Sequence, residues 1–196
     1  MTNRASERAV RTLTLLPLTA GVLACALALP ACKEEAPPPP PPPPPRAPQK
    51  VDAQAFATDP RVQFPFEHAP TDESLAKAVA DLASALAQGD ETAFGALLDN
   101  PSRQVLAEQV RTGAWERETA DIEAVRVVSL TVEGGATAVA TLAVQDPRGA
   151  YLLAWKGVRT GDAWLFGGAP SPDTRAPRAS DLDGAAASAL STSPTP

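Results

Sequence analysis

The fold is decided by residues 122–166, which read IEAVRVVSLTVEGGATAVATLAVQDPRGAYLLAWKGVRTGDAWLF. Apolar and polar residues alternate along this stretch with a period of two, the pattern of strands that bury one face. On the first strand, the residues expected to share a face are Ile122, Ala124, Val128, Leu130 and Val132. Turn residues divide the stretch at Gly134-Gly135, at Asp146-Pro147-Arg148-Gly149 and at Thr160-Gly161-Asp162. The stretch therefore predicts a four-stranded antiparallel meander.

A long helix is predicted before this meander. It opens at Pro70-Thr71-Asp72-Glu73, where a capping hydroxyl precedes acids in the first turn, and it ends at Gly89. Its apolar stripe at helical spacing consists of Leu75, Val79, Leu82 and Leu86. Ser84 is expected on the side that faces away from this stripe.

Two shorter helices are predicted to follow. Asp90 caps the first, and the second starts at Asn100-Pro101, because proline is tolerated in the first turn of a helix. On this third helix Val105, Leu106 and Val110 are expected to be buried. Helices followed by a long meander predict an α+β fold class, with N-terminal helices packed on a curved antiparallel four-stranded sheet.

Several of these motifs together resemble a known superfamily. They are a helix that ends in Gly89-Asp90-Glu91-Thr92-Ala93-Phe94, the strand turn at 146–149, and Gly161-Asp162-Ala163-Trp164 at the start of the last strand. In this order they resemble the nuclear-transport-factor-two-like superfamily, also called SnoaL-like or cystatin-like cone domains. The resemblance covers about residues 70–168. It implies a cone-like domain with an apolar pocket at its mouth, where enzymes of the superfamily place an aspartate, tyrosine or histidine.

The N-terminus has the pattern of an export signal. Arginines stand at positions 4, 8 and 11, and residues 12–31 form an apolar run without any charge. Twenty uncharged residues are also long enough for a membrane-spanning anchor. The run is, however, interrupted by Pro17, Gly21 and Pro30. A cleaved signal peptide over residues 1–31 is the preferred interpretation.

A cysteine follows this run in a characteristic context. Leu29-Pro30-Ala31-Cys32 resembles the lipobox of bacterial lipoproteins, which implies that Cys32 becomes the lipid-carrying first residue. Val22-Leu23-Ala24-Cys25 is a rival box. Cys32 is preferred because the charged residues Lys33-Glu34-Glu35 follow it directly. The expected location is the bacterial cell envelope, and Lys33 resembles the sorting signal of outer-membrane lipoproteins of enteric bacteria, which implies an outer membrane anchor facing the periplasm or the cell surface.

Composition divides the rest of the chain into three parts. Residues 32–69 are predicted to be a lipid-anchored proline-rich linker, in which the nine prolines at 37–45 form an extended rod of roughly 28 Å at about 3.1 Å per residue. Residues 70–168 are the predicted folded domain. Residues 169–196, rich in Pro, Ser, Ala and Thr, are predicted to be a disordered tail.

Charge and residue types narrow the classes of function. The first 31 residues hold three arginines and one glutamate, so their removal lowers the net charge from −6 to −8. Such an acidic chain with scattered basic residues is a poor partner for nucleic acid. The chain has two cysteines and one histidine, His68, so the sequence predicts no metal site, no cofactor and no disulfide within the domain.

Candidate pocket residues lie on the third strand. Tyr151, Leu153 and Trp155 share one face, so they line the cone if that face is concave. No acid and base pair is placed by the sequence, and no catalytic residue is predicted. We therefore expect a membrane-anchored lipoprotein that displays a non-catalytic domain for an envelope protein or a small apolar ligand. The alternatives are a SnoaL-like pocket enzyme using Tyr151 and a purely structural surface protein.

Overall fold

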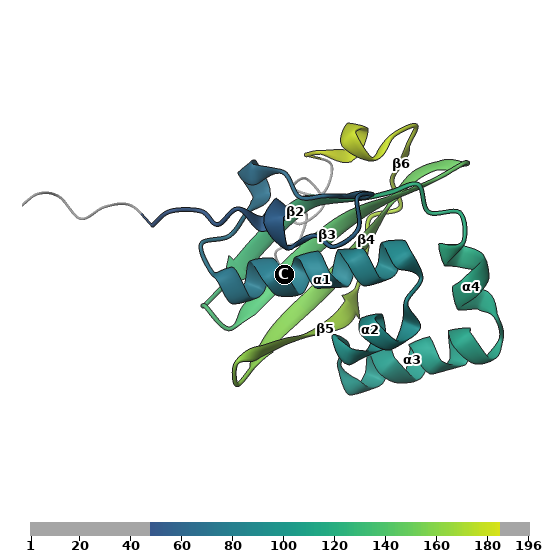
Figure 1. Ribbon diagram of the computed structural model, residues 1–196, viewed down its shortest axis with the longest axis horizontal. Coiled ribbons are helices and arrows are strands. Elements are labelled where there is room, and N and C mark those ends of the chain that lie inside the picture. Colours follow the sequence, from purple (N-terminus) through teal and green to yellow (C-terminus); the bar gives the residue numbers. More distant parts are fainter. Residues whose placement is uncertain (1–47, 185–196) are drawn as a thin grey trace, which may run out of the picture. The chain divides into compact units, whose positions relative to one another are not determined.

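The computed structural model describes residues 48–184. The signal sequence, Cys25, Cys32 and the proline run 37–45 lie outside the described residues. The described part of the chain confirms the α+β class (Figure 1). Its helices are α1 (Glu73–Gln88), α2 (Glu91–Ala96), α3 (Asn100–Arg111) and α4 (Ala114–Thr119). Between residues 48 and 184, no helix is both long enough and apolar enough to cross a membrane.

The sheet has six strands rather than the four predicted. Its four long strands form the expected antiparallel meander: β2 (Ala124–Glu133), β3 (Thr137–Asp146), β4 (Gly149–Thr160) and β5 (Ala163–Ala169). The short strand β1 (Val62–Gln63) adds to β2 in parallel, and β6 (Arg175–Ala176) pairs with β4 antiparallel. Two-residue strands in proline-rich segments carry no visible period of two, which is why the pattern did not predict them.

A β-bulge changes which residues of β2 share a face. The pairing with β3 shifts between Val127 and Ser129, so Val127 pairs with Leu142 while Ser129 pairs with Thr141. The extra residue, Val128, is buried against the opposite face of the sheet. The predicted single face through Ala124, Val128 and Leu130 is therefore wrong, because a bulge inserts one residue and breaks the alternation.

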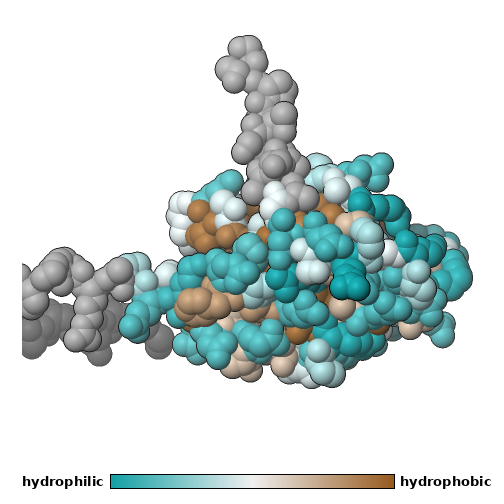
Figure 2. Space-filling model, turned by 90° about the horizontal axis from the view of Figure 1, so that it is seen from above, coloured by the Kyte–Doolittle hydropathy of each residue, from teal (hydrophilic) through white to brown (hydrophobic). Residues whose placement is uncertain are grey.

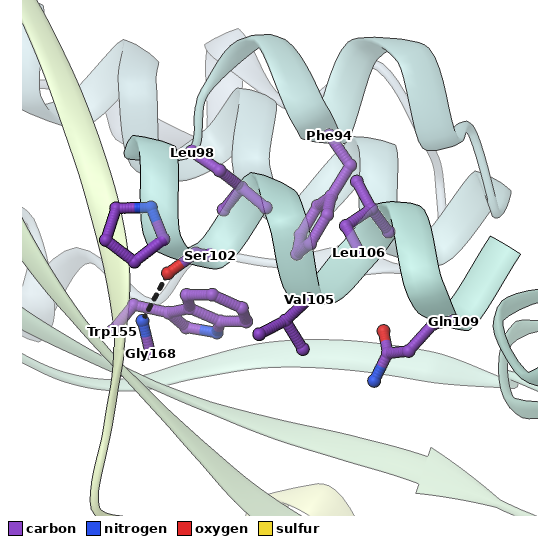
Figure 3. Close-up of a pocket in the computed structure, with 9 residues that line it drawn as sticks. Phe94, Leu98, Ser102, Val105, Leu106, Gln109, Trp155 and Gly168 are labelled. Atoms are coloured by element: carbon purple, nitrogen blue, oxygen red, sulfur yellow. Dashed lines mark hydrogen bonds between the residues drawn. The ribbon is translucent and has the colours of Figure 1, made fainter.

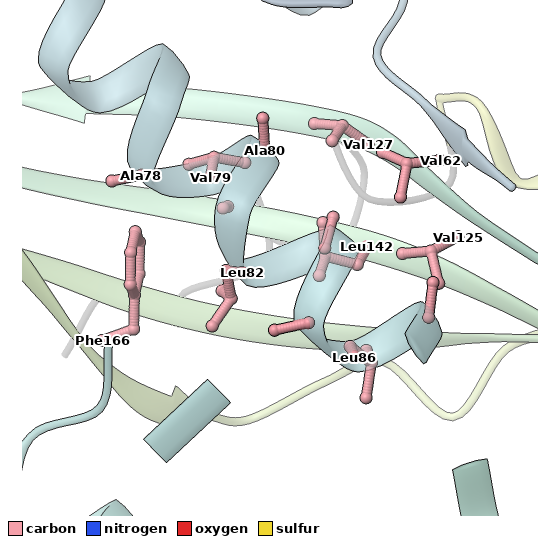
Figure 4. Packing of buried hydrophobic residues seen from close by; sticks show 14 of the residues in the cluster. Val62, Ala78, Val79, Ala80, Leu82, Leu86, Val125, Val127, Leu142 and Phe166 are labelled. Carbon is pink, nitrogen blue, oxygen red and sulfur yellow. The ribbon is translucent and has the colours of Figure 1, made fainter. Parts of the chain in front are cut away.

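Helix α1 packs along one face of this sheet (Figure 4). Its N-cap is Asp72 rather than the expected Thr71 hydroxyl, and the Asp72 carboxylate accepts a hydrogen bond from the Leu75 backbone N–H at 3.1 Å. The helix turns its large side chains toward the strands, where they meet residues of β2, β3 and β5. This part of the core contains Leu75, Val79, Leu82, Leu86, Val125, Val127, Leu142 and Phe166.

The back of α1 is covered by part of the predicted linker. Residues 51–69 contain η1 (Ala53–Phe56), β1 and η2 (Phe66–His68); η1 and β1 pack on α1, whereas η2 packs on β2. Ser84, expected to face away, is only 2% exposed, and its hydroxyl accepts a hydrogen bond from the Thr58 backbone N–H at 3.1 Å. The packed part of the chain therefore begins before the predicted boundary at residue 70.

The described part of the predicted tail, residues 169–184, also packs on the sheet. Its short helix η3 (Ala179–Leu182) buries Leu182 to 1% exposure. Ala179 and Leu182 cover the sheet face opposite α1, where they contact a second apolar cluster made of Val128, Ala143, Ala150 and Leu152. The Arg126 guanidinium Nε donates to the Asp183 carboxylate at 2.8 Å and holds the end of this segment on β2. Both faces of the sheet are thus covered along part of their length.

We expect Leu182→Ala to lower the free energy of unfolding by about 2–4 kcal/mol, because it leaves a cavity in this second cluster. Ser180→Ala, at an exposed position of the same short helix, is the matched control and should change stability by less than about 0.5 kcal/mol. Urea unfolding of the full chain measures both. A wild-type midpoint for Leu182→Ala contradicts the packing of residues 169–184.

Candidate functional site

Helix α3 is held at its first turn and leaves most of its length away from the core. The Asp99 carboxylate accepts from the Ser102 N–H at 2.9 Å and caps the helix. The loop before it joins the edge of β5, since Asp99 N–H donates to the Phe166 carbonyl at 2.9 Å and Phe166 N–H donates to the Leu97 carbonyl at 2.8 Å. These bonds fix the direction of the α3 axis, and the helix runs past the end of the sheet.

The side chains of α3 pack much less than its sequence predicts. Of the three residues expected to be buried, only Leu106 is, while Val110 is half-buried and Val105 is 61% exposed. The reason is the direction of the helix axis, which the bonds at Phe166 fix. A hollow therefore remains between α3 and the strands β4 and β5.

This hollow has a volume of about 280 Å³ (Figure 3). It is lined by residues of α2, α3, β4, β5 and the loop after α2: Phe94, Leu98, Pro101, Ser102, Val105, Leu106, Gln109, Trp155 and Gly168. At roughly 30 Å³ per water molecule in the liquid, it has room for about nine waters. It therefore suits a small organic molecule better than a peptide.

An aromatic cluster forms the inner wall of the hollow. The ring of Phe94 meets the indole of Trp155 edge to face, with 5.4 Å between centroids and an interplanar angle of 84°. On its other side, Phe94 lies 5.0 Å from the buried indole of Trp115, which is supplied by α4. Helix α4 occupies the charged segment 113–121, where no helix was predicted. This cluster gives the hollow an aromatic, apolar wall.

The polar groups of the hollow are few and uncharged. The Ser102 hydroxyl oxygen accepts a hydrogen bond from the Gly168 N–H at 3.2 Å, which joins α3 to β5 at one end. Gln109 contributes an amide, whereas the indole Nε1 of Trp155 is covered by the protein. None of the nine lining residues has an ionisable side chain, so the lining holds no acid and base pair for proton transfer.

The three residues predicted to line the pocket do share one face of β4. Tyr151, Leu153 and Trp155 are half-buried and pack against the main core, whereas their neighbours Leu152 and Ala154 are buried toward the opposite face. Only Trp155 lines the hollow beside α3. The residues missed by the sequence are those of α2 and α3, above all Phe94 and Val105. The one sequence feature that could have indicated these pocket residues is the small number of apolar residues in α3, which is too few to cover a sheet.

Tyr151 lies toward the charged end of the same face. The Arg148 guanidinium forms an ion pair with the buried Asp146 carboxylate at 2.9 Å. Burial of Asp146 acts to raise the pKa of its carboxyl, but the hydrogen bonds from Arg148 outweigh it, and the pKa lies below its usual value. The pKa of Tyr151 is raised, first by burial and then by the charges of Asp146 and Glu118. A tyrosine that removes a proton near neutral pH needs the opposite shift.

His68 and the acidic residues form no further site. His68 is half-buried at the end of η2 and lies outside the hollow. Within residues 48–184, no three His, Cys, Asp or Glu side chains come together as a metal-binding group. A second hollow, of about 480 Å³, lies between α2 and α3 and shares Leu106 with the first, but it lacks the aromatic wall.

A comparison with protein families found no match, and neither did a comparison with curated proteins.

Tyr151 is the one tyrosine of the chain, so the near-ultraviolet absorbance of tyrosinate reports on it alone. We expect its titration midpoint above the ordinary value of 10.0 in the folded chain. Because the folded-state pKa is raised, the stabilising contribution is fully present below pH about 10 and is lost as pH rises through the folded pKa. The urea-unfolded chain is the control and should titrate near 10. A folded midpoint at or below the unfolded one contradicts the burial of the hydroxyl.

Proposed function

We propose that this chain is a lipid-anchored bacterial lipoprotein whose α+β domain binds a small apolar ligand at the cell envelope, without chemistry. The observation that carries the proposal is the hollow between α3 and β4, which has an aromatic wall and no ionisable lining residue. Ligand sites are typically concave, mostly apolar and supplied with a few placed polar groups. The hollow is concave and mostly apolar, has few polar groups, and is small for a ligand site at about 280 Å³.

The proposal includes a cone-like domain of the nuclear-transport-factor-two-like kind. The order of helices before a long antiparallel meander supports it, and so does a hollow between the helices and one face of the sheet. That is where the resemblance implies a pocket. The cone shape of the sheet and membership of that superfamily are therefore part of the proposal.

The surface favours a small ligand over a large protein partner. The exposed large apolar residues of the described segment are far apart in the sequence and come from different elements: Phe66, Val105, Val132 and Val158. On the face shown in Figure 2, hydrophobic residues form separate small patches among hydrophilic ones. Stable protein interfaces use larger continuous patches. An acidic domain with this surface also does not suit nucleic acid.

The proposed anchor is the lipid on Cys32, with the outer membrane as its destination. Two or three acyl chains hold a protein on a bilayer, at about 0.8 kcal/mol for each buried methylene. The proline run after the cysteine, at 37–45, is proposed to separate the domain from the lipid surface. The ligand would then be met at the membrane surface or in the adjoining aqueous layer.

We expect Cys32→Ser to abolish labelling by a radioactive fatty acid and to move the protein out of the membrane fraction, because the acylated sulfur is lost. Cys25→Ser is the matched control, since Cys25 is the only other cysteine, and it should keep both label and membrane association. The reverse pattern assigns the anchor to Cys25. Labelling of both variants contradicts a lipoprotein with a single anchor site.

Ligand binding is tested with ethylbenzene as an apolar probe of suitable size. The full chain is held in lipid nanodiscs, and the probe is supplied at fixed vapour pressure so that partitioning into lipid leaves its activity unchanged. We expect the probe to raise the unfolding temperature of the wild type, since a ligand at about 100 times its Kd adds about 2.7 kcal/mol. Val105→Trp fills the mouth of the hollow and should remove this effect.

The control for that variant is Val158→Trp, at an exposed position of β4 that does not line the hollow. It should respond to ethylbenzene like the wild type. Equal stabilisation of the Val105→Trp chain places the binding elsewhere, and no stabilisation of the wild type argues against a ligand of this class.

A further inference from the structure

The three tryptophans of the chain differ in how their indole N–H groups are satisfied. Trp115 Nε1 donates to the Gly89 carbonyl at 2.9 Å, and Trp164 Nε1 donates to the Ser74 hydroxyl at 3.1 Å. Trp155 Nε1 is buried, with less than 1 Å² accessible, and has no acceptor among the described residues. Only one other side-chain atom between residues 48 and 184, the Ser129 hydroxyl oxygen, is in this state.

The neighbours of Trp155 on the sheet explain why it has no partner. In the register of the strands, Trp155 lies between Ala140 on β3 and Gly168 on β5. Neither residue carries a polar side chain, and the aromatic and aliphatic groups around the hollow also offer no acceptor. An unpaired buried N–H is costly, and buried polar groups in proteins usually have a partner. Among the residues that line the hollow, Trp155 Nε1 is therefore the one buried side-chain donor without a hydrogen-bond partner.

Gly168 leaves open space on the strand that pairs with β4 at Trp155. Its backbone is not in the left-handed region, and a methyl group added there would meet nothing within 4 Å. The glycine is thus required neither by its conformation nor by packing, yet it lines the hollow next to Trp155. The open space at Gly168 belongs to the hollow to which the ligand is assigned above.

We propose that the ligand of this hollow is an uncharged, mainly apolar molecule with one accepting oxygen, of the ketone or ester class, and that Trp155 Nε1 donates to that oxygen. This rests on the proposed ligand-binding function of the same hollow. An ion is excluded because no lining side chain carries a charge to pair with it. A polyhydroxylated molecule is excluded because the hollow offers too few polar partners.

Contact between the oxygen and Nε1 requires a local rearrangement, because Nε1 is covered in the unliganded structure. Val105 stands opposite Trp155 and is 61% exposed, so its side chain can move outward without leaving a core (Figure 3). Side-chain changes of this size are common on binding. The indole can then turn its N–H toward the hollow.

The experiment compares acetophenone with ethylbenzene, which have nearly the same shape and differ by a carbonyl oxygen. The full chain in nanodiscs carries nitrogen-15 in its indole rings, which gives three N–H signals, and Trp155→Phe identifies the signal of Trp155. We expect acetophenone to bind roughly fivefold to tenfold more tightly than ethylbenzene at equal activity, as one hydrogen bond allows. It should also move the Trp155 indole proton downfield, while the signals of Trp115 and Trp164 stay in place.

Two variants test whether the preference for acetophenone depends on the indole N–H of Trp155. Trp155→Phe keeps an aromatic ring but removes the donor, so it should bind both probes with equal affinity, and unchanged Trp115 and Trp164 signals show that it is folded. Trp164→Phe is the control and should keep the preference for acetophenone. Equal binding of both probes to the wild type, with the Trp155 signal unmoved, overturns this inference and leaves the proposed function standing. Failure of both probes to bind overturns the proposed function and this inference with it.

Discussion

Burial of helix α1 on nearly all sides is the constraint on which the rest of the structure depends. Eleven of its sixteen residues are buried, including six alanines and Ser84. Its large side chains face the sheet, and its small ones allow residues 51–69 to lie close against its back. The sheet alone cannot cover such a helix. The preceding segment therefore belongs to the domain, although its composition is that of a linker.

The same constraint explains where the hollow lies. The start of α1 is hydrogen-bonded to β4 and β5. The Trp164 indole donates to Ser74, and the Arg159 guanidinium donates to Asp72 at 3.2 Å. The sheet extends beyond the part that α1 covers, and α3 has one buried side chain with which to cover the remainder. Elements with few buried contacts open most easily. The candidate site thus lies at the least tightly packed part of an otherwise closed core.

The features that could be predicted from the sequence are those that depend on short-range patterns. The period of two gave β2 to β5, and the Gly134-Gly135 turn has the positive φ angles of 60° and 76° that such a hairpin requires. The bulge at Val128, the strand β6 and the burial of Leu182 depend on pairing between distant residues, which no local period records. The exposure of Val105 likewise depends on the bonds between Phe166 and the loop before α3. Trp155 could be placed on the correct face by alternation, but the hollow beside it could not.

The face of β4 that carries Tyr151 and Trp155 has two electrostatic environments. Near Tyr151 lie Asp146 and Arg148, and the Arg175 guanidinium lies 5.4 Å from the centre of the tyrosine ring. Around Trp155 the groups are aromatic and aliphatic. The pKa of Tyr151 lies above its ordinary value of 10.0, so at neutral pH its hydroxyl is protonated, and the Trp155 indole N–H is likewise a hydrogen-bond donor. Of the two residues, only Trp155 lines the hollow. Hydrogen-bond donors on this face of β4 therefore lie in two different surroundings, one charged and one apolar.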